Sequence, residues 1–447
     1  MIGYLFILLV NLIYIQCWRF GLISDDKSEM EIAPYNARQE KRLNTILHLV
    51  VGWYIYYAFG CSLVSLTAAV LFSIHPLAVQ VPAWKSGRQH GYDGLIFLVV
   101  LAFAPLTIPF YFTFHFGYPT IIFTPLIFIF TKHWYIAFLT PFMLWRFIKP
   151  FKVAMKAKIE GGGIMDGPGL PKDVIGMQTW KWRNLIIVVK TFGYYSLACL
   201  LPLKNGFYNS FLGTLVASKK TSAYWYSFNR QFWGGIAAMA MMAVIWWFNR
   251  DNFIGIGIML FVLSIGPYCN WIILQMFVTP RYAYVALIGF QVALAGLLVQ
   301  LGFFGILVSV GLGLFYLIQL IRVLPHYKKD NITLIELDSQ IFPDYPSLWY
   351  LRYEHWLYKQ NYVMAWAEAA YGLKHHPEDC QLYFGLAVAS FHLGDLNAAT
   401  EFVKTSERFM VLADRENMAG YIVSLKAKIE EALRDKWVTQ ANRRFRL

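Results

Sequence analysis

The sequence predicts an all-α protein in which a polytopic membrane bundle precedes a short helical C-terminal domain. Two observations lead to this fold class. First, 58% of the 447 residues are hydrophobic and only 15% are charged, whereas a soluble domain carries about 25% charged residues. Second, apolar runs recur up to residue 323, and a more charged pattern of helical periodicity begins at Pro346. We therefore predict a membrane domain over 1–323, a linker over 324–345 and a helical domain over 346–447.

The apolar runs predict about eleven membrane spans, because a helix of about 20 apolar residues crosses the hydrocarbon core. The first run lacks a basic start and a small-residue cleavage site, so we expect an uncleaved helix rather than a signal peptide. The expected spans lie at 2–22, 43–59, 61–77, 92–110, 116–131, 134–148, 185–203, 232–248, 253–276, 284–302 and 304–323.

The distribution of basic residues predicts which side of the membrane each loop occupies. The lysine-rich stretch from Arg146 to Arg183 follows the sixth span, and the positive-inside rule places such a stretch, together with the N-terminus, in the cytoplasm. An odd number of spans then puts the C-terminal domain on the extracytoplasmic side. We expect a bacterial inner membrane, or the endoplasmic reticulum membrane in a eukaryote. The polar groups expected on the extracytoplasmic side are Asp25, Asp26, the 78–91 loop, Lys132, the 204–231 loop and Arg281.

The net charge and the cysteines exclude several classes of function. The charge of +13 is explained by loop placement and by contact with anionic lipid headgroups, so we expect membrane lipids and no nucleic acid among the partners. The five cysteines show no spacing typical of a disulfide framework, and no Cys/His cluster indicates a metal. We expect no metal and no cofactor.

Two windows of the C-terminal domain align at a spacing of 34 residues, with small residues where helices cross and Gly or Pro at the turns. This pattern is typical of tetratricopeptide (TPR) repeats, and a helix over 413–436 is a candidate cap. An unrelated helical hairpin domain is the alternative. Trp349, Trp356 and Trp366 exceed what two small helical pairs need inside, which predicts an exposed surface for a protein acceptor or partner subunit. The aligned residues are Trp349, Tyr353, Trp356, Ala365, Ala369 and Pro377, then Tyr383, Ala387, Ser390, Gly394 and Ala399.

Two adjacent carboxylates, Asp25 and Asp26, follow the first apolar run, which holds Arg19 as its one charge. Ionisable groups at a membrane boundary are costly to desolvate and are candidates for function. The alternative is a solvated loop start with no further role.

Several stretches in this order resemble a known family. They are RLNTILHLVVGWYIYYAFG, LTAAVLFSIHPLAVQVPAWKSGR, FTKHWYIAFLTPFMLW, KTFGYYSLACLLPLKNGFYNSF, LSIGPYCNW and TPRYAYVALIGF. The most specific motifs are HP-x(7)-W-x-S-G-R, from His75 to Arg88, and R-Y-x-Y, from Arg281 to Tyr284. Ahead of the repeats, they resemble the transmembrane-and-TPR O-mannosyltransferase-like proteins of the GT-C glycosyltransferase superfamily.

The resemblance implies an enzyme that moves a sugar from a polyprenyl-phosphate carrier to the hydroxyl of a protein or other extracytoplasmic acceptor, without a metal. Asp25 or Asp26 matches the family's general base. Cationic groups are needed to stabilise the phosphate leaving group, and arginine binds phosphate oxygens with a rigid fork. The expected substrate-binding residues are Arg88, Arg281, Lys132, Lys85, His75 and Tyr282.

The sequence departs from this family where acidic residues are usual. Those positions hold Gln80, His90, His133 and Pro280, and Asp93 is a candidate to replace one of the missing acids. A catalytically inactive GT-C-like scaffold, whose repeats dock an extracytoplasmic protein assembly, is therefore the alternative. For single residues, Arg88 and Lys85 can instead reach lipid headgroups, and His75 can be a structural histidine.

Overall fold

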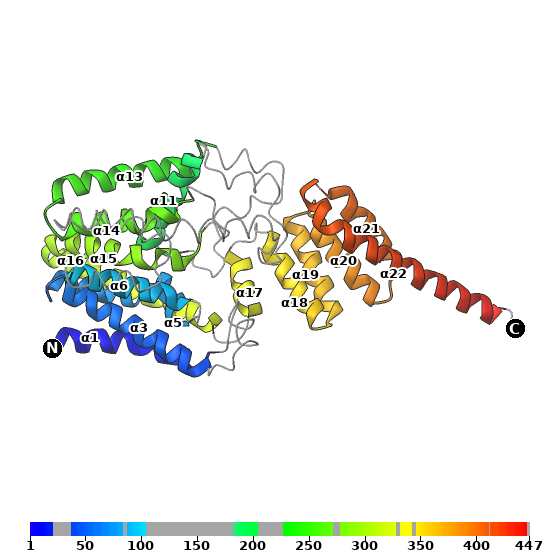
Figure 1. The fold of residues 1–447 in the computed structure, drawn as a ribbon, viewed down its shortest axis with the longest axis horizontal. Coiled ribbons are helices and arrows are strands. Elements are labelled where there is room, and N and C mark those ends of the chain that lie inside the picture. The colour runs from blue at the N-terminus through cyan, green and yellow to red at the C-terminus, as the bar shows by residue number, and fades with distance from the viewer. Residues whose placement is uncertain are drawn as a thin grey trace, which may run out of the picture. The chain divides into compact units, whose positions relative to one another are not determined.

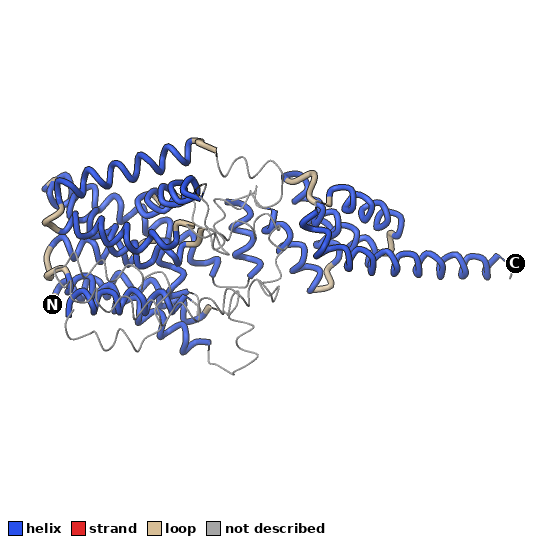
Figure 2. The backbone as a smooth tube through the Cα atoms, turned by 45° about the horizontal axis from the view of Figure 1, so that its top comes forward, coloured by secondary structure: helices blue, strands red, loops and turns tan. Residues whose placement is uncertain are grey.

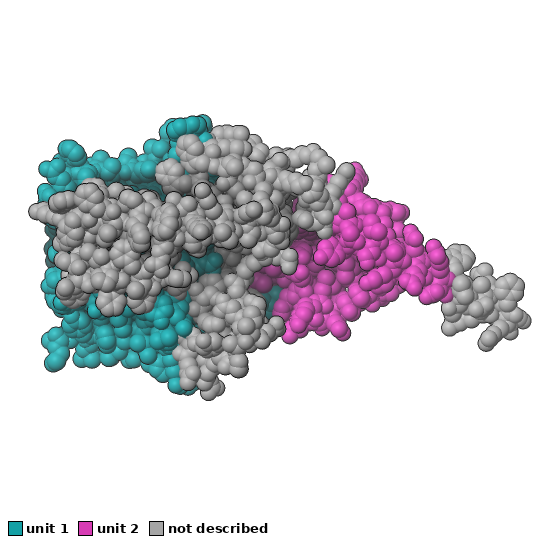
Figure 3. All heavy atoms as spheres, viewed as in Figure 1, with its two compact units in different colours: residues 1–161, 181–209, 226–334 teal, residues 162–180, 210–225, 335–447 magenta. Residues whose placement is uncertain are grey.

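The computed structural model is helical, and no strand occurs among the residues it describes (Figures 1 and 2). These residues are 1–20, 37–83, 87–103, 182, 184–203, 227–270, 278–327, 331–341, 346–410 and 412–444. The chain divides into two compact units (Figure 3). The described part of unit 1 ends at Leu334, and that of unit 2 begins at Ile335.

Unit 1 is a bundle of apolar helices. Each expected span that falls within the described residues coincides with a helix, whereas the expected spans at 116–131 and 134–148 lie outside them. The helices are α1 (Ile2–Asn11), η1 (Leu12–Arg19), α3 (Ala37–Ala58), α4 (Leu63–Ser73), α6 (Arg88–Phe103), α11 (Asn184–Leu200), α13 (Arg230–Asn249), α14 (Phe253–Ile265), α15 (Tyr284–Gln300) and α16 (Gly302–Val323).

Four helices in the described part of the chain are long and apolar enough to cross a membrane: Ile2–Arg19, Arg230–Asn249, Pro280–Gln300 and Gly302–Tyr327. A fifth is added if the bent pair Leu63–Ser73 and Pro76–Ala83 is counted as one span. Large apolar side chains, including Trp247 and Phe303, are exposed on the outside of α13 and α16. An apolar outer surface of this extent is typical of a membrane protein rather than of a water-soluble monomer.

The predicted span 61–77 ends early. Helix α4 ends at Ser73, and the chain turns by 59° into η2 (Pro76–Val79) and α5 (Gln80–Ala83). Pro76 explains the break, because a proline lacks the amide hydrogen and disfavours helical conformation in the preceding residue. Side chains satisfy the backbone there: Tyr14 Oη donates to the Ser73 carbonyl at 2.8 Å. The break is buried in protein, as irregular backbone within a membrane requires.

The predicted span 253–276 is also too long, since α14 ends at Ile265 and is followed by η7 (Gly266–Tyr268), which contains Pro267. Helix α14 lies against α15 through glycines. A Cβ atom on Gly257 would lie 2.5 Å from the Ala293 nitrogen, and one on Gly289 would lie 2.5 Å from the Phe261 nitrogen. Small residues thus let the two backbones approach closely, which is typical of membrane helix pairs.

The two ends of the bundle differ in chemistry. The end that holds the N-terminus is closed by aromatic contacts, such as Phe59 against Phe253. At the opposite end, where Figure 1 places α5, η2 and α5 pack against η8 (Pro280–Ala283). The polar groups of α5, η8 and the start of α6 therefore meet at one end of unit 1.

Unit 2 consists of two helical hairpins and a long final helix, α22 (Leu412–Arg444). The first hairpin is α18 (Pro346–Tyr358) and α19 (Tyr362–His375), and the second is α20 (Cys380–His392) and α21 (Leu396–Phe409). The first helices of the two hairpins begin at 346 and 380, and the second helices at 362 and 396, so both pairs repeat after 34 residues. The turns repeat too, because Gln360 (φ 57°) and Gly394 (φ 83°) are also 34 residues apart.

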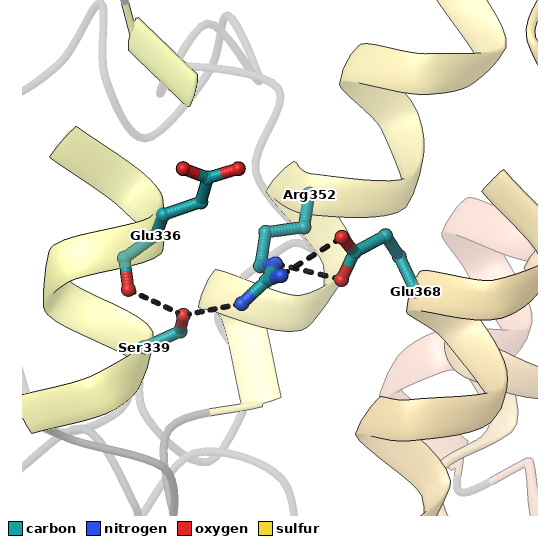
Figure 4. Close-up of polar contacts among 4 residues, drawn as sticks. All are labelled: Glu336, Ser339, Arg352 and Glu368. Carbon is teal, nitrogen blue, oxygen red and sulfur yellow. Dashed lines mark hydrogen bonds and ion pairs between the residues drawn. The ribbon is translucent and has the colours of Figure 1, made fainter. Parts of the chain in front are cut away.

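The predicted linker 324–345 contains helices. Leu324 and Tyr327 of η9 (Leu324–Tyr327) pack into the core of unit 1, and so does Leu334 of α17 (Asn331–Ile341). Within unit 2, Arg352 of α18 joins Ser339 of α17 to Glu368 of α19 (Figure 4).

The predicted aromatic surface of unit 2 is wrong for Trp349. This side chain is only 2% exposed and stacks on His375 inside the first hairpin. The reason is that the indole fills the gap where α18 crosses α19 beside Gly372, which leaves room for it. Trp356 is half-buried, and Trp366 is the exposed member of the three.

Candidate functional site

The structure describes four of the eight predicted site residues: His75, Arg88, Arg281 and Tyr282. Asp25, Asp26, Lys85 and Lys132 lie outside the described residues, as does His133. The proposed roles of all eight remain predictions, but the surroundings of the four described residues show how the chain positions them.

Gln80 joins α5 to η8 although the two are 201 positions apart. Its buried Oε1 accepts hydrogen bonds from the Arg281 backbone N–H at 3.2 Å and from Thr279 Oγ1 at 3.3 Å. The Thr279 backbone N–H in turn donates to Tyr195 Oη of α11 at 3.2 Å. Gln80 therefore has a definite structural task, which is to fix the backbone of the R-Y-x-Y motif.

Arg281 lies beside a stacked pair of tyrosines. The rings of Tyr268 and Tyr282 are 4.5 Å apart at 17° to one another, and Arg281 Cζ is 5.5 Å from the centre of the Tyr282 ring. A guanidinium at this distance is attracted to the negative face of an aromatic ring. The half-buried charge of Arg281 is thus held on an aromatic surface.

Asp93 and His90 of α6 complete the cluster. Asp93 is 2% exposed, and its Oδ2 lies 4.0 Å from His90 Nδ1. The His90 ring meets Tyr282 edge-on at 6.1 Å, and both Asp93 and Arg281 are within electrostatic range of Tyr268. A carboxylate buried in an apolar bundle is costly and is a candidate for function. We call Tyr268, Tyr282, Arg281, His90 and Asp93 the tyrosine–arginine cluster.

Arg88 is anchored near the same place. A Cβ atom on Gly87 would lie 2.4 Å from the Gln80 carbonyl oxygen, so the chain before Arg88 presses directly against Gln80. The Arg88 Nε donates to Asn44 Oδ1 of α3 at 2.7 Å. Both arginines of the predicted site are therefore anchored around Gln80, one through Gly87 and one through its own backbone N–H.

Sequence reasoning missed Lys41 and Asn44 of α3. Buried Lys41 donates from Nζ to the Ala83 carbonyl at the end of α5, at 2.5 Å. The two residues are three positions apart and so lie on one helix face. Polar residues with this spacing at the start of the apolar run 43–59 were the available signal.

His75 is fully buried, and both of its ring nitrogens are hydrogen-bonded within the protein. Nδ1 accepts from the Leu77 backbone N–H at 3.2 Å, and Nε2 donates to the Cys199 carbonyl at 3.0 Å. These bonds cap η2 and tie the bend after α4 to the end of α11. The geometry favours a structural histidine over a residue that contacts substrate.

A second buried histidine, which the sequence analysis did not single out, holds the R-Y-x-Y motif from below. His48 Nδ1 accepts from Tyr284 Oη at 2.8 Å, and its Nε2 donates to the Ser73 carbonyl at 3.2 Å. The carbonyl can only accept, so it fixes the proton on Nε2 and makes Tyr284 the donor. The motif is therefore fastened at both ends, by Gln80 before Arg281 and by His48 at Tyr284.

Among the residues that the structure describes, no group of three or more His, Cys, Asp or Glu side chains could hold a metal ion. Comparison with known proteins found no matching family model, no matching curated protein and no matching solved structure.

Proposed function

We propose that the chain is a membrane glycosyltransferase that moves a sugar from a polyprenyl-phosphate carrier to a hydroxyl of a protein or other extracytoplasmic acceptor. The observation that carries this proposal is the tyrosine–arginine cluster. It sets a guanidinium, an imidazole and a buried carboxylate at the polar end of an apolar bundle. A donor with a charged phosphate and a long hydrocarbon tail needs such a polar site within an apolar surrounding.

The proposed reaction forms a bond between the acceptor oxygen and the anomeric carbon of the sugar. The bond from that carbon to the phosphate oxygen breaks, and the lipid phosphate leaves with the electron pair. Asp25 or Asp26 takes the acceptor proton as general base. Arg281 and Arg88, together with Lys85 and Lys132, stabilise the negative charge of the phosphate.

The proposal includes an integral membrane location with about eleven spans, the N-terminus in the cytoplasm and unit 2 outside. A single cysteine introduced as Asn397→Cys on the exposed side of α21 tests this topology, because native Cys380 is buried. In a Cys61→Ser background, an impermeant maleimide should label Asn397→Cys in intact cells. Labelling only after the membrane is opened would overturn the topology.

We also propose that the two hairpins are TPR repeats with α22 as their cap, and that they bind a protein acceptor or partner subunit. The 34-residue repetition of helix starts and turns supports this assignment. Deletion from Pro346 onward should abolish recovery of that partner with the chain, and undiminished recovery would contradict the proposal.

Transfer of labelled sugar from a polyprenyl-phosphate donor, by the purified full chain in lipid, tests the enzyme proposal. Asp25→Asn or Asp26→Asn should slow transfer by about 10²–10⁴-fold, the usual contribution of a positioned base. Asp251→Asn is the control, because Asp251 is exposed in the turn between α13 and α14. Transfer at the wild-type rate by both site variants would exclude this role.

The second candidate is a catalytically inactive scaffold with the same bundle. Gln80 favours it, because an amide stands where the resembled family has an acid and is engaged in holding η8. If the chain is a scaffold, no donor will give label transfer, yet the full chain will still recover an extracytoplasmic protein partner.

A further inference from the structure

The second helices of the two hairpins present very different surfaces at equivalent positions. On α19 the outward arc holds Val363, Trp366, Ala367, Ala370, Tyr371 and Lys374. On α21, 34 positions later, the same arc holds Asn397, Thr400, Glu401, Lys404, Thr405 and Arg408. The arc on α21 includes an ion pair, with Lys404 Nζ 2.9 Å from Glu401 Oε1, which is typical of a solvated helix face.

The first hairpin exposes apolar side chains that its fold does not require. Tyr358, at the end of α18, is 86% exposed, and Val363, across the turn, is 64% exposed. Trp366 follows one helical turn later and is 39% exposed. Because the second hairpin has the same backbone register with a polar arc, packing alone does not explain these residues. A contiguous apolar surface of this kind indicates contact with something other than water.

The composition of the surface identifies its partner as a lipid headgroup region. Between residues 358 and 376 the chain has one carboxylate, Glu368, and that carboxylate pairs with Arg352 at 2.7 Å in the interior. The exposed charges are the cations Lys359 and Lys374. Tryptophan and tyrosine favour the membrane–water interface, and lysines beside it are attracted to anionic lipids.

The length of chain before the hairpin keeps it within reach of the membrane. The last helix that is long enough to cross a membrane ends at Tyr327, and α18 begins at Pro346. Eleven of the intervening residues form α17, which spans about 1.5 Å per residue. The first hairpin is also reached along the chain before the second, which explains why only the first has an apolar arc.

We propose that the turn and outer arc of the first hairpin lie on the anionic lipid surface of the membrane that holds unit 1. Tyr358, Val363 and Trp366 enter the interface, and Lys359 and Lys374 contact lipid phosphates. This inference rests on the proposed membrane location but not on sugar transfer, so its failure would leave the enzyme proposal intact.

Nitroxide spin labels at matched positions test the proposal in the full chain. Val363→Cys and Asn397→Cys are compared in a Cys61→Ser background, because the other native cysteines are buried. The protein is placed in nanodiscs of phosphatidylcholine, with and without phosphatidylglycerol. The label at 363 should be accessible to oxygen and shielded from a nickel chelate, as expected about 5–10 Å into the interface, whereas the label at 397 should show the reverse.

Three outcomes would overturn the proposal. Equal accessibility of both labels to the nickel chelate would show that the arc faces water. Shielding of the label at 363 from both reagents would show that protein covers it. Dipolar broadening between labels at 363 would identify a second copy of the chain as the partner.

Charge reversal tests the lipid specificity. The double variant Lys359→Glu/Lys374→Glu should remove any increase in the depth of the label at 363 caused by phosphatidylglycerol, whereas Lys404→Glu on the second hairpin should not. An unchanged lipid dependence in the double variant would refute the role of the two lysines.

Discussion

The two units each hold an arginine close to carboxylate and aromatic groups, but they arrange these groups differently. In unit 2, Arg352 Nε lies 2.7 Å from Glu368 Oε2, Nη2 donates to Oε1 at 2.8 Å, and Nη1 donates to Ser339 Oγ at 2.7 Å (Figure 4). In unit 1, Arg281 is held on the Tyr282 ring, and the separation between His90 and Asp93 is 4.0 Å.

The difference separates a structural pair from a candidate site. The Arg352–Glu368 pair is bidentate and joins three helices, which is the geometry of a buried ion pair that holds a fold together. The tyrosine–arginine cluster is fixed chiefly through the backbone of Arg281 and through aromatic contacts. We therefore expect changes in the first to affect folding and changes in the second to affect ligand binding.

The largest expected effect is on the ion pair. Arg352→Met should lower the free energy of unfolding of unit 2 by about 3–5 kcal/mol, because it leaves the Glu368 carboxylate buried without its partner. Hydrogen exchange of α18 and α19 in the full chain would measure the loss. The double variant Arg352→Met/Glu368→Leu should recover most of it, and a single variant as stable as wild type would contradict the structural assignment.

Arg281 should show the opposite behaviour. Arg281→Lys keeps the charge but loses the fork, so transfer at subsaturating donor should fall by roughly 10–100-fold, equivalent to about 1.5–3 kcal/mol of charge-assisted hydrogen bonding. The melting temperature should change little. Arg250→Lys is a matched control, since Arg250 Cζ lies 5.7 Å from the Trp247 ring but in an exposed position. Equal effects of the two substitutions would remove Arg281 from the site.

The tyrosine pair should contribute less. Tyr268→Leu removes the stacking partner of Tyr282, and an aromatic pair is worth about 0.5–1.5 kcal/mol beyond its buried area. We expect a several-fold rise in the KM for the lipid donor with kcat nearly unchanged, as steady-state transfer kinetics would show. A fall in kcat at constant KM would mean that the pair acts in the chemical step instead.

The smallest effect concerns His392, which stacks on Tyr362 at 4.3 Å between the hairpins. Burial and, to a lesser degree, the charge of Lys428 lower the pKa of His392. The unfolded chain therefore binds the proton more readily, so this residue stabilises unit 2 less as the pH falls below about 6.5. Thermal unfolding should show a weaker loss of stability on acidification in His392→Gln, and an identical pH dependence would contradict this.

Much of the fold was predictable because its signals are local. Apolar runs marked the helices of unit 1, and the 34-residue spacing marked the two hairpins, since helical periodicity is written in neighbouring residues. The breaks were less predictable. Pro76 and Pro267 are visible in the sequence, but apolar residues continue past both, so the predicted spans 61–77 and 253–276 ran too far.

The candidate site was predictable in its residue types but not in its assembly. Arg281, Tyr282 and Arg88 could be named from motifs, and Asp93 could be noted as a possible acid. Their common anchor on Gln80 depends on contacts between α5, η8 and α6. Likewise, Trp349 could be named as an aromatic excess, but only the crossing of α18 and α19 shows that its indole is buried.

By itself, then, the sequence determined the helices, their order, their apolar character and the repeat in unit 2, because each of these follows from residues a few positions apart. The tertiary structure decided which polar groups meet: Gln80 with Arg281, His48 with Tyr284, and Arg352 with Glu368. Partners separated by as many as 201 positions leave no periodic trace in the chain. The packing of whole helices, rather than any local preference, brings them together.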